Sequence, residues 1–293
     1  MDLTAKQLEF RRRKENVDRI EEAILLMEKD IKRNIKKLGF ANNDVEIELI
    51  EKEIEIYTRL LSGLVIIWSE NMIKWLLYEH GAFYNEQIQG LLSRSELKQK
   101  WTGALNAAFF DFYAGLTYDP NNPLPRKNSI INSTLIREKD KKRYNKIYEL
   151  IRKNLGDSIK IRNKIQHGDW VHSYSKSDTT KEYEIDSILT SSVTNENILK
   201  LRLKRKQFKL LYHLIRDLAV FRKKGKFKLD NNSSPFSYFF GKRYGEILNL
   251  QKTIDNFNFE NYKNELIERH VRGGDWKERN TNTQIQTDII PVV

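Results

Sequence analysis

The chain has 293 residues, of which 31% are charged and 39% are hydrophobic, and its formal net charge is +12 at pH 7. That length can bury a substantial core, and the basic balance favours a polyanionic partner such as RNA over a neutral metabolite, although a positive charge can also serve solubility alone. The absence of cysteine excludes disulfides, thiolate metal sites and a cysteine nucleophile, and it suits a reducing compartment, so we expect a cytoplasmic protein.

The amino-terminal part predicts a helical hairpin. From Leu8 to Leu38 apolar residues recur every three or four positions among Lys, Arg and Glu, which is the pattern of a long amphipathic helix. Gly39 ends this pattern, and after a turn at Asn42-Asn43 the same spacing resumes. We assign residues 1–53 to this hairpin extension.

Residues 54–224 predict an all-α helical bundle. The segment from Leu60 to Leu77 is apolar on nearly all sides, so we expect it to be the most enclosed helix. Glu70 interrupts it, and its carboxylate must lie at a solvated edge, beside a partner or near a functional site. The densest apolar run, Leu60 to Trp68, is about half of a membrane span, and no signal peptide is recognisable, so we expect no membrane association. Further helices are expected at about residues 85–92, 97–112, 138–153 and 194–218.

Residues 225–293 are expected to form a loop-rich extension with a polar tail. The helical pattern weakens after Lys224, where only short helices are expected at Glu246 to Ile254 and Tyr262 to Arg269, and from Arg272 to Asp288 the composition is polar. An aromatic patch is expected to anchor this extension to the bundle rather than to stack on bases; it consists of Pro235, Phe236, Tyr238, Phe239 and Phe240.

A short helix before His167 is where the sequence suggests chemistry. Gly156 is expected to end the preceding helix, which begins near Glu138, and Asp157 is expected to cap a new helix that runs to His167. Gly168 follows as the glycine that commonly lies just past a helix end.

The two faces of this short helix differ. Ile161 and Ile165 lie one turn apart on a stripe that is expected to face the core. Asn163 and His167 are also four positions apart and lie on the opposite side. Arg162 lies on the flank, and its long side chain can swing toward the histidine. A guanidinium, an amide and an imidazole are therefore expected at the exposed end of one helix.

These side chains suit the cleavage of a phosphodiester by the neighbouring 2′-hydroxyl. An arginine can hold a phosphate and stabilise the charge that develops on it, and histidine side chains move protons near neutral pH. The alternative is structural: Arg162 caps carbonyl groups, and His167 is an ordinary helix-terminal histidine that the helix dipole favours.

The arginine, a polar residue, three further positions and then His-Gly resemble the Arg-x4-His motif of the HEPN superfamily, helical proteins that include many metal-independent ribonucleases. The order of the expected helices over roughly residues 54–221 is also similar to the HEPN bundle. The resemblance implies an endoribonuclease in which Arg162 and His167 are catalytic, with Asn163 beside them, and in which the motif helices of a homodimer meet. Some HEPN proteins have an acidic residue on an early helix, which makes Glu70 a possible auxiliary residue.

The same resemblance implies partners. RNA is the expected substrate, and a bacterial toxin or antiviral defence component would have an antitoxin or another partner protein. HEPN toxins paired with a nucleotidyltransferase tend to have a tyrosine two positions after the histidine, but Asp169 lies there, so we do not expect that modification. The competing interpretation is a non-catalytic helical module that binds RNA or a protein.

Basic side chains supply candidates for RNA binding. Besides Lys164 in the motif, the first turns of the helix expected after Thr194 are basic, although a solvated helix face explains the same pattern; the candidates there are Lys204, Arg205 and Lys206. The chain has no phosphate-binding loop, no dinucleotide fingerprint and no His-Glu-x-x-His zinc motif. We therefore expect no metal and no cofactor.

Overall fold

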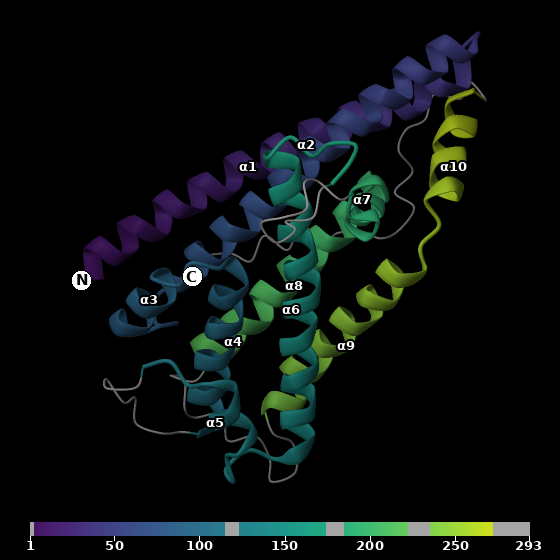
Figure 1. The fold of residues 1–293 in the computed structure, drawn as a ribbon. Helices are drawn as coiled ribbons and strands as arrows, with labels where there is room; N and C mark the ends of the chain where they lie inside the picture. Colours follow the sequence, from purple (N-terminus) through teal and green to yellow (C-terminus); the bar gives the residue numbers. More distant parts are fainter. Residues whose placement is uncertain (1–2, 115–122, 174–184, 222–234, 272–293) are drawn as a thin grey trace, which may run out of the picture.

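The computed structural model describes residues 3–114, 123–173, 185–221 and 235–271, and over these ranges the protein is all-α, as the sequence predicts. The helices are shown in Figure 1. In chain order they are α1 (Leu3–Lys37), η1 (Leu38–Phe40), α2 (Asp44–Leu77), α3 (Asn85–Leu92), α4 (Leu97–Ala114), α5 (Lys127–Ile131), α6 (Glu138–Gln166), α7 (Ser187–Thr194), α8 (Ile198–Phe221), α9 (Pro235–Asn256) and α10 (Phe259–Val271).

Helices α1 and α2 form the expected hairpin. They lie side by side, with α10 beside their connection (Figure 1). The side chain of Asn43, in the expected turn, caps α2 by accepting a hydrogen bond from the Glu46 N–H at 2.9 Å. One stripe of α1 is fully buried, because its apolar residues recur at helical spacing; these are Val17, Ile24, Ile31 and Ile35.

The hairpin and the bundle share one core. The boundary expected after residue 53 lies inside α2, which continues without a break from Asp44 to Leu77. Its buried side continues through Ile50, Leu61 and Val65, so the apolar pattern offers no place for a break. The buried residues of α1 belong to the same cluster as the largest enclosed side chains of the bundle, which are Trp68, Trp101, Tyr144, Phe109 and Phe208.

Helix α6 is longer than predicted. The expectation that Gly156 ends a helix and that Asp157 caps another is wrong, because α6 continues through both residues from Glu138 to Gln166. Its buried face continues across the glycine, from Leu155 to Ser158, Ile161 and Ile165. A glycine inside a helix costs only about 1 kcal/mol, which packing along such a face readily offsets.

The carboxyl-terminal helices also differ from the expectation. Thr194 ends α7, and the cap of α8 is Asn197, whose side chain accepts a hydrogen bond from the Lys200 N–H at 2.9 Å. The short helices expected at residues 246–254 and 262–269 are confirmed within α9 and α10, but both helices are longer than expected, so that residues 235–271 are mostly helical rather than loop-rich. Helix α9 joins the main core through Phe240 and Ile247. The remaining side chains of the aromatic patch and the polar tail from residue 272 lie outside the described part.

Within the described part, one helix has the length and composition to cross a membrane. This is α2, whose most apolar window has a mean hydropathy of 1.3, and 56% of that window is buried against the rest of the protein. The central helix of a helical bundle passes the same test, so the finding does not by itself indicate insertion.

Candidate functional site

The motif lies at the carboxyl end of α6, where a tight cap fixes the backbone. His167 is the last residue of the helical turn, and Gly168 takes the left-handed conformation with φ at 88°. The Gly168 N–H donates to the Ile165 carbonyl at 3.2 Å, and the Asp169 N–H donates to the Lys164 carbonyl at 2.9 Å. These two bonds make a Schellman motif, which confirms that Gly168 terminates the helix.

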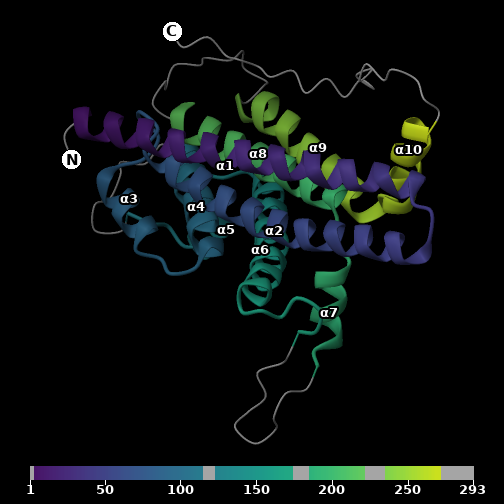
Figure 2. The same ribbon diagram turned by 90° about the horizontal axis from the view of Figure 1, so that it is seen from above.

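The buried side of the motif faces a satellite cluster rather than the main core. Ile161 and Ile165 are buried, as predicted, and they pack with Val193 of α7. Trp170 folds back over them, and its Nε1–H donates to the Ile165 carbonyl oxygen at 2.8 Å. Figure 2 shows α7 on the side of the molecule away from α1, α8 and α9. The cluster therefore attaches α7 to the end of α6 and holds the motif at the periphery.

The polar side of the motif is open to solvent. Asn163 and His167 are both exposed, as predicted, and Arg162 is half-buried on the flank. The Arg162 Nη1–H donates to the Asn163 Oδ1 at 3.2 Å, so the guanidinium and the amide lie together. The Nε of Arg162 is buried and has no hydrogen-bond partner in the described part of the chain.

Glu70 of α2 lies within electrostatic range of Arg162, which the sequence could not establish. Its carboxylate pairs with Lys74 at 2.7 Å on the same helix. Burial by itself raises the pKa of Glu70, but the hydrogen bond and charge of Lys74, with the charges of Lys100 and Arg162, outweigh it and lower the pKa. The carboxylate is therefore ionised at neutral pH and lies near cations from three helices.

This group, which we call the Glu70 cluster, comprises Glu70, Lys74, Lys100 and Arg162. It carries three formal positive charges against one negative charge, a surplus of two. A partly buried cluster with that surplus attracts a phosphate, because the interior screens charge less than water does. His167 lies five residues along the helix from Arg162, or about 7.5 Å at 1.5 Å per residue.

Lys164 is less available than the sequence suggested. Its Nζ pairs with the Asp169 carboxylate at 2.9 Å across the helix cap. Asp169, two positions after the histidine, thus helps to close the helix end. Among the described residues, no three His, Asp or Glu side chains come together as a metal site would require.

The basic stretch of α8 is turned toward the rest of the protein. Lys204 is buried and pairs with Glu196 at 2.8 Å, and Arg205 pairs with Glu21 of α1 at 3.1 Å. Of the three residues on α8 that were expected to bind RNA, only Lys206 is exposed. The structure thus corrects the expectation for Lys204 and Arg205: Arg205 holds α8 against an acidic side of α1, and Lys204 pairs with the connection between α7 and α8.

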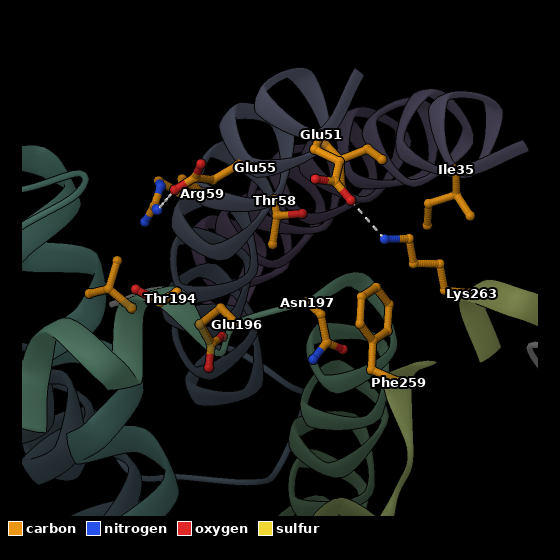
Figure 3. Close-up of a pocket in the computed structure, with 12 residues that line it drawn as sticks. Ile35, Glu51, Glu55, Thr58, Arg59, Thr194, Glu196, Asn197, Phe259 and Lys263 are labelled. Atoms are coloured by element: carbon orange, nitrogen blue, oxygen red, sulfur yellow. Dashed lines mark hydrogen bonds and ion pairs between the residues drawn. The ribbon is translucent and has the colours of Figure 1, made fainter. Parts of the chain in front are cut away.

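A small cavity of about 170 Å³ lies between α2, α10 and the connection of α7 to α8 (Figure 3). Charged side chains around it are paired within the chain: Lys263 with Glu51 at 3.0 Å, and Arg59 with Glu55. None of the motif residues lines this cavity. It therefore does not form part of the candidate site.

Two residues of the Glu70 cluster were missed in the sequence. Lys74 follows Glu70 by four positions in a helix, so its pairing with Glu70 was predictable from spacing. Lys100 lies on α4, and only the packing of α4 and α6 with α2 brings it near Glu70.

Comparison of the chain with family models, with curated proteins and with solved structures finds no match. The resemblance to HEPN proteins therefore depends on the motif and the helix order alone.

Proposed function

We propose that this protein is a metal-independent endoribonuclease of the kind found among HEPN toxins and antiviral defence effectors, acting in a reducing compartment such as the cytoplasm. One juxtaposition carries the proposal: Arg162 lies in a cationic cluster around Glu70, a turn and a half of helix from the exposed imidazole of His167. A site that attracts phosphate and presents an imidazole supplies the two requirements of RNA cleavage by its own 2′-hydroxyl.

In this mechanism Arg162 holds the scissile phosphate and stabilises the negative charge that grows on its oxygens. His167 accepts the proton of the 2′-hydroxyl while the 2′-oxygen forms a bond to phosphorus. The bond from phosphorus to the 5′-oxygen breaks, and that oxygen takes a proton from a second acid. The products are a 2′,3′-cyclic phosphate and a 5′-hydroxyl, and water is not consumed.

Glu70 and Asn163 act as positioning residues. The carboxylate of Glu70 attracts the guanidinium of Arg162 from α2, and the amide of Asn163 accepts its hydrogen bond on α6. A guanidinium oriented in this way loses less side-chain entropy when it binds phosphate.

The second proton-transfer group comes from a second copy of the chain, so the active form is a homodimer in which the two motif helices meet. Exposed apolar side chains near the motif support an interface with another chain at this end of α6. Val171, Ile185 and Ile188 are 60%, 54% and 80% exposed. An antitoxin or other restraining protein would act by covering this same end.

An RNA cleavage assay tests the proposal. Wild type should cut RNA to cyclic phosphate ends, His167→Ala and Arg162→Ala should not, and His172→Ala should behave as wild type because that exposed histidine lies outside the motif. Cleavage should persist in excess EDTA, since a guanidinium and an imidazole need no metal. If wild type and His167→Ala cleave RNA equally, or if neither wild type nor any variant cleaves RNA, the proposed ribonuclease activity is wrong and the interpretation as a binding module is favoured.

A further inference from the structure

The outer face of α2 carries an apolar stripe that nothing in the described part of the chain covers. Val45, Leu49, Ile56 and Leu60 are 67%, 59%, 45% and 41% exposed. At 100° per residue, these four positions fall within about 60° of arc, so they form one line along the helix. Isolated exposed apolar residues are common, but a line of four along one helix is the pattern of a surface that packs against another helix.

The spacing of this stripe is the same in both directions along the helix. The apolar residues are separated by four, seven and four positions, with Lys52 and Glu53 at the middle. If a second copy of α2 lies antiparallel with a twofold axis at the middle, Val45 faces the partner's Leu60, and Leu49 faces the partner's Ile56. Lys52 then faces the partner's Glu53. An isologous contact requires this self-complementarity, whereas an unrelated partner would not.

We propose that the outer face of α2 is a self-association surface, on which two copies of the chain pair their α2 helices antiparallel around Lys52 and Glu53. The occupant we assign is a second copy of this chain. The proposal concerns a different surface from the motif and does not depend on the proposed function.

Charges beside the stripe are compatible with this pairing. Although this part of α2 is acidic, three of its five glutamates form ion pairs within the chain: Glu48 with Lys52 at 2.8 Å, Glu51 with Lys263 at 3.0 Å, and Glu55 with Arg59. These pairs remove most of the repulsion that two acidic helices would meet. The amide of Asn34 holds the Glu53 carboxylate at 2.9 Å, so the central acid is fixed in place.

The contact is separate from the motif. Glu70 lies about 26 Å along the helix from the proposed axis, at 1.5 Å per residue. The stripe itself is about 22 Å long, so two copies bury an area at the low end of specific interfaces and should associate at roughly micromolar concentrations. A chain that uses both contacts forms assemblies larger than a dimer.

Sedimentation velocity over a range from low to high micromolar concentration tests the surface. Leu49→Glu and Ile56→Glu should each weaken self-association at least tenfold and lower the average mass. The matched control is Leu26→Glu, because Leu26 is 64% exposed on α1 but lies off the stripe. An equal effect of Leu26→Glu, or a wild type that stays monomeric throughout, overturns the proposal. The proposal is also overturned if the protein stays monomeric and binds phosphatidylcholine vesicles, and if Leu49→Glu abolishes that binding.

Thiol crosslinking tests the register, since the chain has no cysteine of its own. A short bis-maleimide should join Val45→Cys chains to Leu60→Cys chains when the two are mixed, and it should join neither variant to itself. Efficient crosslinking of either variant alone would show a parallel or shifted contact and overturn the register. RNA cleavage by Leu49→Glu at wild-type rate separates this contact from the motif, because loss of α2 pairing leaves the motif intact.

Discussion

Replacing two glycines of α6 by alanine should change stability in opposite directions. Gly156 lies inside the helix, where alanine is stabilising, and Gly168 lies just past its end in a left-handed conformation, with φ at 88°. A methyl group at Gly156 would meet no atom nearer than the Lys98 Cδ at 4.0 Å, and one at Gly168 would meet nothing within 4 Å. Neither substitution causes a clash, so backbone conformation decides both outcomes.

The magnitudes follow from that conformation. Gly156→Ala should raise the free energy of unfolding by about 0.5 to 1 kcal/mol, since glycine loses more backbone entropy than alanine on entering a helix. Gly168→Ala should lower it by about 1 to 2 kcal/mol, the cost of a left-handed conformation for a residue with a Cβ. The two variants should therefore differ by roughly 2 kcal/mol or more.

Urea unfolding followed by circular dichroism measures both values, with an unchanged slope against denaturant as the sign that the folded state is intact. A destabilising Gly156→Ala would mean that the helix breaks there, as the sequence alone suggested. A stabilising Gly168→Ala would show that α6 continues past His167 and that the motif does not lie at a helix end.

Four further outcomes are expected. Glu70→Gln should lower the free energy of unfolding at pH 7 but much less near pH 3. The pKa of Glu70 is lowered in the folded protein, so its carboxylate stabilises the fold at pH values above its ordinary pKa of 4.5, and this contribution is lost as the carboxylate protonates. Urea unfolding at both pH values measures the difference. Ile165→Ala should cost about 2 kcal/mol, the low end for a buried isoleucine, because it packs in a small satellite cluster; unfolding curves against wild type would show it. Asn163→Ala should keep the melting temperature and reduce RNA cleavage severalfold, whereas a drop in melting temperature alone would contradict its place on the exposed side. Ile188→Glu should abolish cleavage and lower the mass of the active species. If this variant cleaves RNA as fast as wild type, the second proton-transfer group does not come from a partner that binds through α7.

Periodicity in the sequence was sufficient to predict the helical class, the hairpin and the faces of the motif. The buried stripe of α1, the exposure of Asn163 and His167 and the burial of Ile161 and Ile165 all follow from positions along one helix. These are local properties, fixed by 3.6 residues per turn and by the chemistry of neighbouring side chains.

Two glycines show where local rules stop. Gly168 and Gly156 both carry the sequence signal of a helix end, yet only Gly168 ends α6. The difference is energetic: packing continues along the buried face past Gly156 and exceeds the small cost of a glycine in the helix. Beyond Gly168 the chain turns back, and Trp170 closes over the end.

Contacts between distant segments were decided by tertiary structure alone. Lys204 and Arg205 have the sequence pattern of an RNA-binding face, but Glu196 and α1 neutralise them. Glu70 and Arg162 are far apart in the chain, and only the crossing of α2 and α6 brings their charges into range. A sequence determines which faces of its helices are apolar or charged, but which charged face meets which is fixed only when the helices pack around a common core.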